Sequence, residues 1–346
     1  MLSSAWSAAV VGVEALPVEI ETHIRTGLPG YAVVGLPQTS VRESRERVLS
    51  AIRSSKLPIP RGAITVSMAP SDLRKEGALF DLPLAMGLLA ANNSPDLRKA
   101  LGRTFMAGEL ALDGRLRPVR GVLPIAELAA RRGARLIVAT ENLAEARRVT
   151  DCRSFGADTL VEARMIALGK SKGEAAPRGA PQARSAGLDM ADVGGQELAK
   201  RALEVAAVGG HHVLFTGPPG AGKTMLARRL PGIMPPLSEA ESLEVTRIQS
   251  VAGLRLESMH AELRPFRAPH HSISRAGLIG GGNPPAPGEI SLATHGVLFL
   301  DELPEFSRDV IESIRQPLES GQVSIRRVQY TVAFPAMVQL VASMNP

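Results

Sequence analysis

The fold of this chain is restricted most by one eight-residue stretch, Gly217-Pro218-Pro219-Gly220-Ala221-Gly222-Lys223-Thr224. The stretch follows the apolar run 212–215 and precedes the segment 225–230, which has the composition of a helix. A buried strand, a glycine-rich turn and a helix in this order are typical of a P-loop. The sequence therefore predicts an α/β fold with a parallel sheet around this loop.

The residue types in the loop suit phosphate binding. Glycines let backbone N–H groups converge on an anion without obstruction by Cβ atoms, and the following helix adds its positive N-terminal dipole. We expect the loop to bind ATP, with Lys223 between the β- and γ-phosphates and the Thr224 hydroxyl on Mg²⁺. The residues predicted to contact the nucleotide are Gly217, Pro218, Pro219, Gly220, Ala221, Gly222, Lys223, Thr224 and Met225.

A second acidic element lies downstream, where the apolar run 296–300 ends in Asp301 and Glu302. Such a run predicts a central parallel strand buried on both faces, and α/β sheets bind ligands at the carboxyl ends of their strands. The pattern looks like a Walker B element, in which Asp301 orients the Mg²⁺ shell and Glu302 polarises the attacking water. Alone, two acids after an apolar strand are mostly structural; beside a P-loop, the catalytic interpretation is favoured.

The composition indicates a globular protein with more than one domain. A chain of 346 residues with 45% apolar and 21% charged residues has room for two cores. Cys152 is the one cysteine, which excludes an internal disulfide and fits a reducing cytoplasm. The longest apolar run, 82–91, is about half of the ~20 residues that a membrane helix needs. We therefore expect a soluble, cytoplasmic protein with no membrane partner.

The net charge of +6 is unevenly distributed. Residues 1–165 carry 22 Lys and Arg against 17 Asp and Glu, whereas residues 188–346 carry 14 against 16. The positive excess therefore lies outside the P-loop half. A polyanionic partner and ordinary solubility charge both explain such an excess, and the sequence leaves the two interpretations open.

The chain divides by composition into two domains and a linker. Residues 1–168 predict an α+β domain, because alternating segments broken by glycine and proline precede and follow helical patterns. Within it we expect a β-meander or hairpin over 8–36, strands at 63–68, 104–110 and 136–139, and helices at 41–52, 84–91, 123–132 and 143–149. Residues 169–187 are rich in Lys, Gly, Ala and Pro and predict a linker. The second domain is 188–346.

In the second domain, Lys223 and Asp301 are 78 positions apart, more than the ~60 that two βαβ units need. We place the surplus in residues 264–288, as an exposed loop. Helices are expected at 198–207 and 309–318, a hairpin at 322–334 and a last strand at 338–345. His270 and His271 are not expected to bind a metal, because adjacent histidines on an extended loop point apart.

Several of these motifs together resemble one family. GPPGAGKT, FRAPHHSISRAGLIGGG, GVLFLDE, the hairpin and SMNP are similar to motifs of the magnesium-chelatase-like AAA+ ATPases, and APSDLRKEGALFDLPLA resembles the ComM/YifB branch. The resemblance implies an AAA+ core in which Asn345 is sensor 1, 264–288 is the helix-2 insert and 321–335 is the pre-sensor-1 hairpin. It further implies a hexameric ring that uses ATP for work on DNA, with branch migration during natural transformation as the role.

The first domain also resembles the peptidase domain of Lon-type proteases, through GELALDGRLRPVRGVLPIAELAARRGARLIV. Aligned by eye, the catalytic serine falls near Leu79 and the lysine near Pro124. Neither side chain can act as a nucleophile or a base. We therefore expect no peptidase activity and assign the domain to DNA contact or ring assembly.

The basic residues of the exposed loops are the candidates for DNA contact, because backbone binding depends on local basic clusters. They are Arg267, Arg275, Arg326 and Arg327. Two alternatives to a DNA motor stay open: a magnesium-chelatase motor subunit, and a scaffold that binds ATP without turnover. The Lon-like first domain, absent from the minimal chelatase motor, argues against the former.

The resemblance also bears on the end of the sequence. Family members continue past the Asn-Pro step into a helical lid, whereas this sequence stops at Pro346. We therefore expect these residues to bind Mg-ATP and to hydrolyse it slowly. Arg308 and Arg315 are candidates for arginines that act on a neighbouring subunit.

Overall fold

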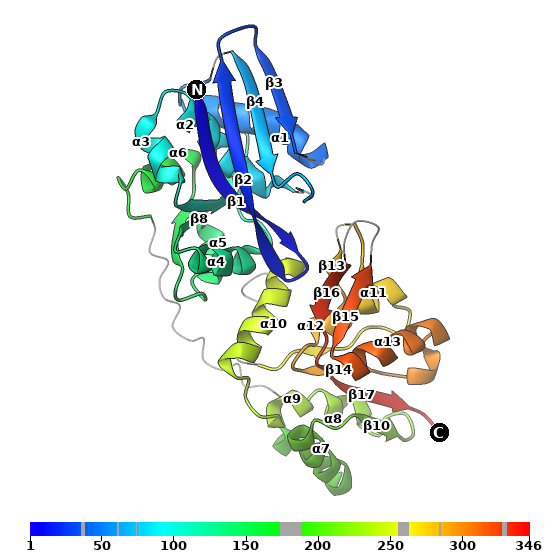
Figure 1. Ribbon diagram of the computed structural model, residues 1–346. Coiled ribbons are helices and arrows are strands. Elements are labelled where there is room, and N and C mark those ends of the chain that lie inside the picture. The colour runs from blue at the N-terminus through cyan, green and yellow to red at the C-terminus, as the bar shows by residue number, and fades with distance from the viewer. Residues whose placement is uncertain are drawn as a thin grey trace. The chain divides into compact units, whose positions relative to one another are not determined.

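The computed structural model forms two compact units, Met1–Ala180 and Pro181–Pro346, each with its own sheet and core (Figure 1). The structure describes residues 1–35, 39–60, 62–73, 75, 77–173, 188–254, 263–283, 285–326 and 331–346. The division between the units falls inside the segment 169–187 that the sequence predicts as a linker.

The first unit contains a seven-stranded mixed sheet in the order β3-β4-β2-β1-β5-β8-β9. Strand β2 runs antiparallel to β1 and β4, and the other neighbours in this sheet are parallel. The strands are β1 (Leu2–Val11), β2 (Glu14–Arg25), β3 (Gly30–Val34), β4 (Ala63–Ala69), β5 (Thr104–Ala107), β8 (Arg135–Ala139) and β9 (Arg153–Ala157). A separate small ribbon pairs β6 (Glu109–Leu110) with β7 (Leu116–Arg117).

Helices cover both faces of this sheet. One core cluster joins α1 (Thr39–Ser54), α2 (Asp81–Ala91), α3 (Pro95–Leu101) and α6 (Leu160–Ala167) to one face, and a second joins α4 (Val122–Arg131) and α5 (Thr140–Ala146) to the other (Figure 1). Helix α2 is buried along its whole length, because it is apolar on every side apart from Asp81 at its start. Leu79 and Pro124, the positions aligned with the Lon dyad, lie in the 3-10 turn η1 (Ala78–Phe80) and in α4.

The second unit is built on a four-stranded parallel sheet in the order β10-β17-β14-β11. These strands are β10 (Val213–Thr216), β11 (Phe266–Arg267), β14 (Val297–Leu300) and β17 (Gln339–Met344). Around the sheet lie α7 (Glu197–Gly209), α8 (Lys223–Ala227), α9 (Leu230–Ile233), α10 (Glu239–Ala252), α11 (Arg275–Ile279), α12 (Glu289–Leu292) and α13 (Arg308–Ser320), with short turns η2 (Met190–Asp192) and η4 (Leu303–Glu305). Two ribbons pair β12 (Gly280–Gly281) with β13 (Ala286–Pro287), and β15 (Gln322–Arg326) with β16 (Thr331–Pro335).

The predicted α/β class with a parallel sheet is confirmed, and so is the central place of the strand before Asp301. Strand β14 lies between β17 and β11 and all four of its residues are buried. One expectation was wrong: residues 266–267 do not belong to an exposed loop but form the edge strand β11, parallel to β14. The sequence reading also missed α3, α6, α10 and β9. Among the described residues, no helix is both long enough and apolar enough to cross a membrane.

Candidate nucleotide-binding site

The glycine-rich loop leads directly from β10 into α8. Gly220 and Gly222 have φ angles of 78° and 84°, a region that favours glycine because other residues are strained there. At Gly220 even an added Cβ would meet no atom within 4 Å, so the backbone of the loop is open on that side. The chain therefore presents the open backbone surface that a phosphate cradle requires.

The Lys223 side chain folds back onto the backbone of this loop. Its Nζ donates hydrogen bonds to the carbonyl oxygens of Gly217 (2.6 Å) and Pro218 (3.1 Å) and to Asn345 Oδ1 (2.9 Å). The lysine and the asparagine are 122 residues apart in the sequence, and they meet because β10 and β17 are parallel neighbours that end at the same edge of the sheet. Two of the three predicted catalytic residues thus lie together.

Thr224 meets the acidic end of β14. Its Oγ1 donates a 2.7 Å hydrogen bond to Asp301 Oδ2, and Ser343 Oγ donates a short hydrogen bond to Asp301 Oδ1. A hydroxyl and a carboxylate that are already adjacent are the oxygen ligands that Mg²⁺ prefers. Thr224 and Asp301 therefore fit the metal site that the sequence predicts for them.

Glu302, the third predicted catalytic residue, leaves the extended conformation of the strand. Its φ of 55° is left-handed, a conformation that is costly for a residue with a Cβ. Its backbone N–H donates to Ser343 Oγ (3.2 Å), and its side chain is 58% exposed. His271 Nδ1 lies 3.9 Å from its Oε2. The carboxylate is thus open to water, as a group that acts on a water molecule must be.

Ser343 is the residue that sequence reasoning missed. It is fully buried at the end of β17, and it touches both Asp301 and the backbone of Glu302. The sequence feature that could have identified Ser343 is a single hydroxyl among apolar residues. It lies two positions before Asn345, in a strand predicted to be buried.

The four arginines predicted to contact DNA are not equivalent. Arg267 makes a two-pronged pair with Glu289, at 2.5 and 2.7 Å, and this hydrogen bonding raises the pKa of the guanidinium. Arg275 is exposed and lies 3.6 Å from Asp309. Arg326 is exposed at the end of β15, and Arg327 lies outside the described residues. Arg267 is therefore already neutralised.

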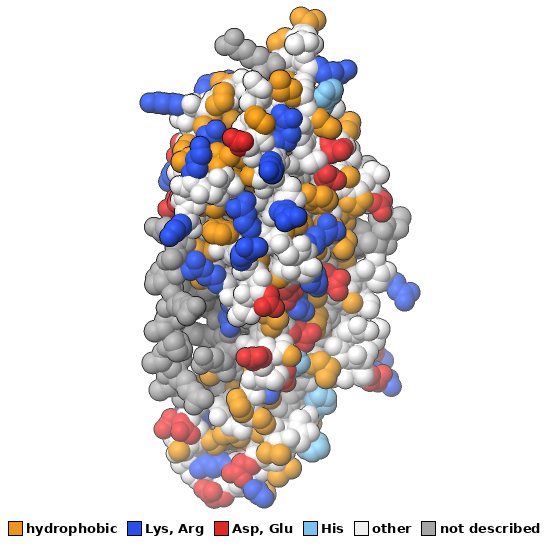
Figure 2. All heavy atoms as spheres, turned by 60° about the vertical axis from the view of Figure 1, so that its left-hand side comes forward, with side chains coloured by type: hydrophobic (Ala, Val, Ile, Leu, Met, Phe, Trp, Pro, Cys, Tyr) orange, Lys and Arg blue, Asp and Glu red, His pale blue; other side chains and the backbone are white. Residues whose placement is uncertain are grey.

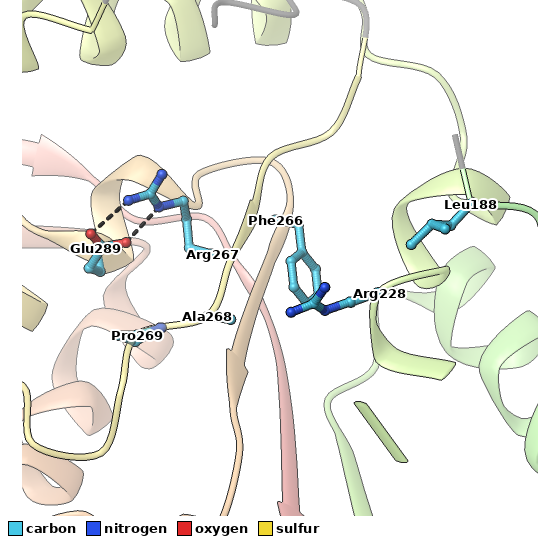
Figure 3. Close-up of a pocket in the computed structure, with 7 residues that line it drawn as sticks. All are labelled: Leu188, Arg228, Phe266, Arg267, Ala268, Pro269 and Glu289. Atoms are coloured by element: carbon cyan, nitrogen blue, oxygen red, sulfur yellow. Dashed lines mark hydrogen bonds and ion pairs between the residues drawn. The ribbon is translucent and has the colours of Figure 1, made fainter. Parts of the chain in front are cut away.

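The Arg267–Glu289 pair forms one wall of a pocket of about 510 Å³ (Figure 3). Phe266 and Arg228 also line it, and in Figure 3 the Arg267 side chain extends toward Glu289. The lining residues are Leu188, Arg228, Phe266, Arg267, Ala268, Pro269 and Glu289.

The two adjacent histidines do not point apart as expected. The rings of His270 and His271 are 4.0 Å apart between centroids, and His270 Nδ1 is 2.9 Å from Ser272 Oγ. Within the described ranges no three His, Cys, Asp or Glu side chains are grouped closely enough to hold a metal ion.

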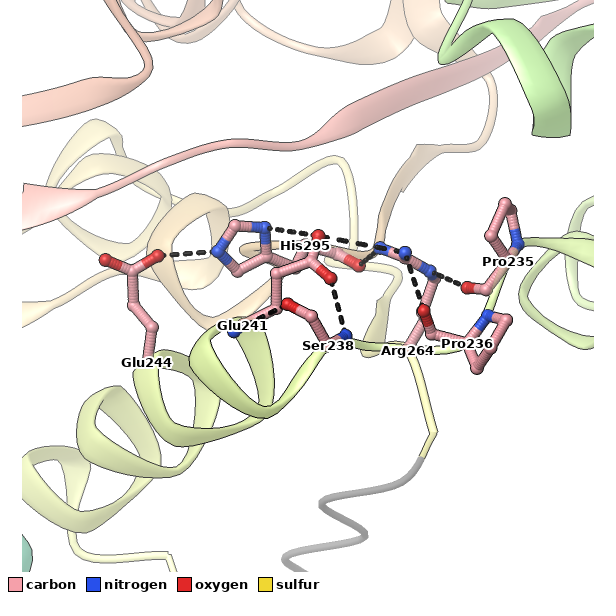
Figure 4. A network of polar contacts seen from close by, with 7 residues as sticks. All are labelled: Pro235, Pro236, Ser238, Glu241, Glu244, Arg264 and His295. Carbon is pink, nitrogen blue, oxygen red and sulfur yellow. Dashed lines mark hydrogen bonds and ion pairs between the residues drawn. The ribbon is translucent and has the colours of Figure 1, made fainter.

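A polar network ties α10 to the chain that enters β14 (Figure 4). His295, which has a left-handed φ of 58°, places Nε2 2.6 Å from Glu244 and Nδ1 3.5 Å from Glu241. Arg264 donates to the carbonyl oxygens of His295 and Pro235, both at 2.6 Å. The network therefore holds the start of the strand that carries Asp301.

The parallel sheet, with its glycine loop, lysine, threonine and acidic strand end, defines a P-loop α/β protein. A family model described as magnesium chelatase, subunit ChlI, matches residues 189–346, and one described as subunit ChlI of Mg-chelatase matches residues 20–142.

Individual relatives agree with these matches. Competence protein ComM of Haemophilus influenzae is 47% identical over 100% of this chain and 69% of its own length. The uncharacterized protein YifB of Salmonella typhimurium is 48% identical over 98% of the chain and 67% of its own length. The magnesium-chelatase 67 kDa subunit of Heliobacterium mobile is 27% identical over 46% of the chain and 28% of its own length. The chain belongs to the ComM/YifB family of magnesium-chelatase-like proteins, as its motifs predicted.

Proposed function

We propose that this protein binds and hydrolyses Mg-ATP at the carboxyl edge of β10, β17 and β14. The observation that carries the proposal is the meeting of Lys223, Thr224, Asp301 and Asn345, which come from distant parts of the sequence. The four side chains combine one cation, one amide and two oxygen ligands beside an open glycine backbone.

Each of these residues has a role in the proposed reaction. Lys223 now donates to neutral carbonyl and amide oxygens, and a bound phosphate would offer its ammonium group an anionic acceptor in their place. Thr224 and Asp301 would hold Mg²⁺, and the bound ion would neutralise part of the phosphate charge. Glu302 orients the attacking water, and Ser343 fixes the two acids relative to each other. Asn345 holds Lys223 in line with the loop.

We further propose that ATP turnover drives an oligomeric AAA+ motor that acts on DNA in the cytoplasm, as a hexameric ring linked to competence. The similarity to Competence protein ComM supports this role. The exposed arginines Arg275 and Arg326 are the second-unit candidates for DNA contact, whereas Arg267 is less suited because Glu289 already pairs with it. We also propose that the first unit is similar in fold to the peptidase domain of Lon-type proteases.

The test is steady-state phosphate release with and without single-stranded DNA, in the wild-type chain and in Glu302→Gln. The motor proposal predicts turnover that DNA stimulates, and a fall of on the order of 100-fold or more in Glu302→Gln with ATP still bound. A scaffold would bind ATP and release no phosphate, and a chelatase subunit would not respond to DNA. Unchanged turnover in Glu302→Gln would exclude the proposed role of this carboxylate.

A further inference from the structure

A row of arginines occupies the amino-terminal edge of three parallel strands in the first unit. Arg103 directly precedes β5, and Arg135 and Arg153 are the first residues of β8 and β9. The Arg135 backbone N–H donates to the Arg103 carbonyl (3.0 Å), and Arg135 is paired in register with Arg153. Since neighbouring strands lie about 4.8 Å apart, the three residues stand side by side across the edge.

The helices that return to this edge add more positive charge. Helix α4 ends at Arg131, and Arg132 follows it and lies 5.4 Å from the centre of the Trp6 ring. Helix α6 ends near the same edge, because Arg135 Nη2 donates to the Ala167 carbonyl, and Lys170 follows that helix. We call Arg103, Arg131, Arg132, Arg135, Arg153 and Lys170 the basic edge.

Among the residues that the structure describes, the members of the basic edge have no acidic partners. Within the described part of the chain, none of the six makes an ion pair with a carboxylate, and all but the half-buried Arg135 are exposed. Burial, and in addition the nearby charge of Arg153, lower the pKa of Arg135. Figure 2 shows Lys and Arg side chains gathered on the upper part of the face drawn there, with few carboxylates among them.

Compensation of helix dipoles explains only part of this charge. The carboxyl ends of α3, α4 and α6 lie near the edge, and each carries a partial charge of roughly −0.5. Three such ends offset about one and a half positive charges out of six. In the described part of the first unit, most of this positive charge is therefore offset neither by helix ends nor by ion pairs.

We propose that the basic edge is a docking surface for the phosphate backbone of DNA, distinct from the arginines of the second unit. The inference rests on the proposed action on DNA and assigns part of that binding to the first unit. An acidic protein is the less suitable partner, because stable protein interfaces have an apolar core. The segments 130–135, 153–154 and 168–172 and the pair 102–103 present no large exposed hydrophobic side chain.

The experiment compares two triple variants of the full chain in the absence of nucleotide. The edge variant carries Arg103→Gln, Arg131→Gln and Arg153→Gln, which avoids Arg135 and its structural hydrogen bonds. The control carries Arg53→Gln, Arg117→Gln and Arg120→Gln, which removes the same charge from exposed positions elsewhere on the first unit. Binding of fluorescent single-stranded and duplex DNA is measured by anisotropy over a series of salt concentrations, with polyglutamate as a competitor.

We expect the edge variant to bind DNA on the order of 10- to 100-fold more weakly at 100 mM salt and to lose roughly two to three units of salt slope, with the control near wild type. Equal losses in the two variants would refute the basic edge, since net charge would then suffice. Wild-type affinity in the edge variant would refute it while leaving the motor proposal intact. Competition by polyglutamate as strong as by DNA of equal charge would favour an acidic protein partner instead.

The proposed motor is tested separately. DNA-stimulated ATP turnover in the wild-type chain, together with unchanged DNA affinity in the edge variant, would retain the motor and reject the basic edge. A wild-type chain that does not bind DNA at low salt would reject both.

Discussion

The candidate nucleotide site and the proposed basic edge differ in how their charged groups are partnered. In the nucleotide site, Lys223 has three acceptors and both oxygens of Asp301 accept hydrogen bonds from hydroxyl groups. At the basic edge, several cations lie together, and none of them pairs with a carboxylate of the described residues. One site is built from single groups with defined partners, and the other from several interchangeable charges.

This difference predicts how each site responds to mutation. A group that alone occupies its position cannot be replaced by its neighbours, so its removal should abolish or strongly reduce the activity. A charge that is one of several contributes only its own share to a summed electrostatic attraction. Single substitutions should therefore have large effects in the second unit and small effects at the basic edge.

The largest effect is expected for Lys223→Ala. Removal of the one ammonium group in the loop should weaken Mg-ATP binding by on the order of 100-fold or more, because a charge-assisted hydrogen bond to the phosphates is lost. Titration calorimetry with Mg-ATP measures this loss. DNA affinity without nucleotide, measured in parallel, should stay at the wild-type level; a joint loss of both would show that the two sites are not separable.

Ser343→Ala should have the next largest effect. Loss of the hydroxyl leaves one oxygen of Asp301 and the N–H of Glu302 without their partner, so the two acids are held less firmly. We expect kcat to fall about tenfold, with less than a twofold change in ATP affinity. Ser343→Thr keeps a hydroxyl at the same position and should restore most of the rate. If threonine fails to do so, the serine matters for packing and not for positioning.

A smaller effect is expected for the single change Arg153→Gln. One backbone contact fewer should weaken DNA binding severalfold and lower the salt slope by roughly 0.7 to 0.9. The matched change Arg120→Gln, at an exposed position outside the edge, should alter neither quantity. A loss as large as that of the triple variant would mean that Arg153 makes a specific contact, and the contrast between single and distributed charges would fail.

Most residues of the candidate nucleotide site could be predicted from the sequence, because their positions follow from local order along the chain. A strand, a glycine turn and a helix place Lys223 and Thr224, and an apolar strand places Asp301, without knowledge of distant contacts. Ser343 could not be recognised in this way, since its role depends on the register between β14 and β17, in which Leu300 is paired with Ala342.

The basic edge could not be predicted from the sequence for the same reason. Arg103, Arg135 and Arg153 are widely separated in the sequence and become neighbours only through the order β5-β8-β9. Strand β9 was itself missed, because RSFGA has little of the apolar alternation that identifies a strand. Arg267 was predicted to lie on an exposed loop. It lies instead in β11, which joins the sheet and places Arg267 against Glu289.

The smallest effect is expected for Glu241, a paired carboxylate that belongs to neither of the two sites. Glu241 accepts a hydrogen bond from the Ser238 backbone at the start of α10, and it lies 3.8 Å from Arg264 and 3.5 Å from His295. The hydrogen bond from Ser238, and in addition the charges of Arg264 and His295, lower the pKa of this carboxyl below its ordinary value of 4.5. A lowered pKa in the folded state means that the ionised carboxylate stabilises the fold above the ordinary pKa, and that this stabilisation is lost as the pH falls through the folded-state pKa.

Glu241→Gln keeps an oxygen that can accept the same hydrogen bond but removes the charge. We expect a loss of about 0.5 kcal/mol in the free energy of unfolding at pH 7, because solvent screens much of the attraction. Urea unfolding followed by circular dichroism should show a constant gap between wild type and variant from pH 7 to about pH 5, and a gap that shrinks as the pH is lowered below 4.5. Glu239→Gln removes a charge from the same helical turn at an exposed position, so it separates the helix dipole from the contacts with Arg264 and His295. An equal loss in both variants would assign the effect to the dipole, and a gap that does not change with pH would show that the charge of Glu241 is not its source.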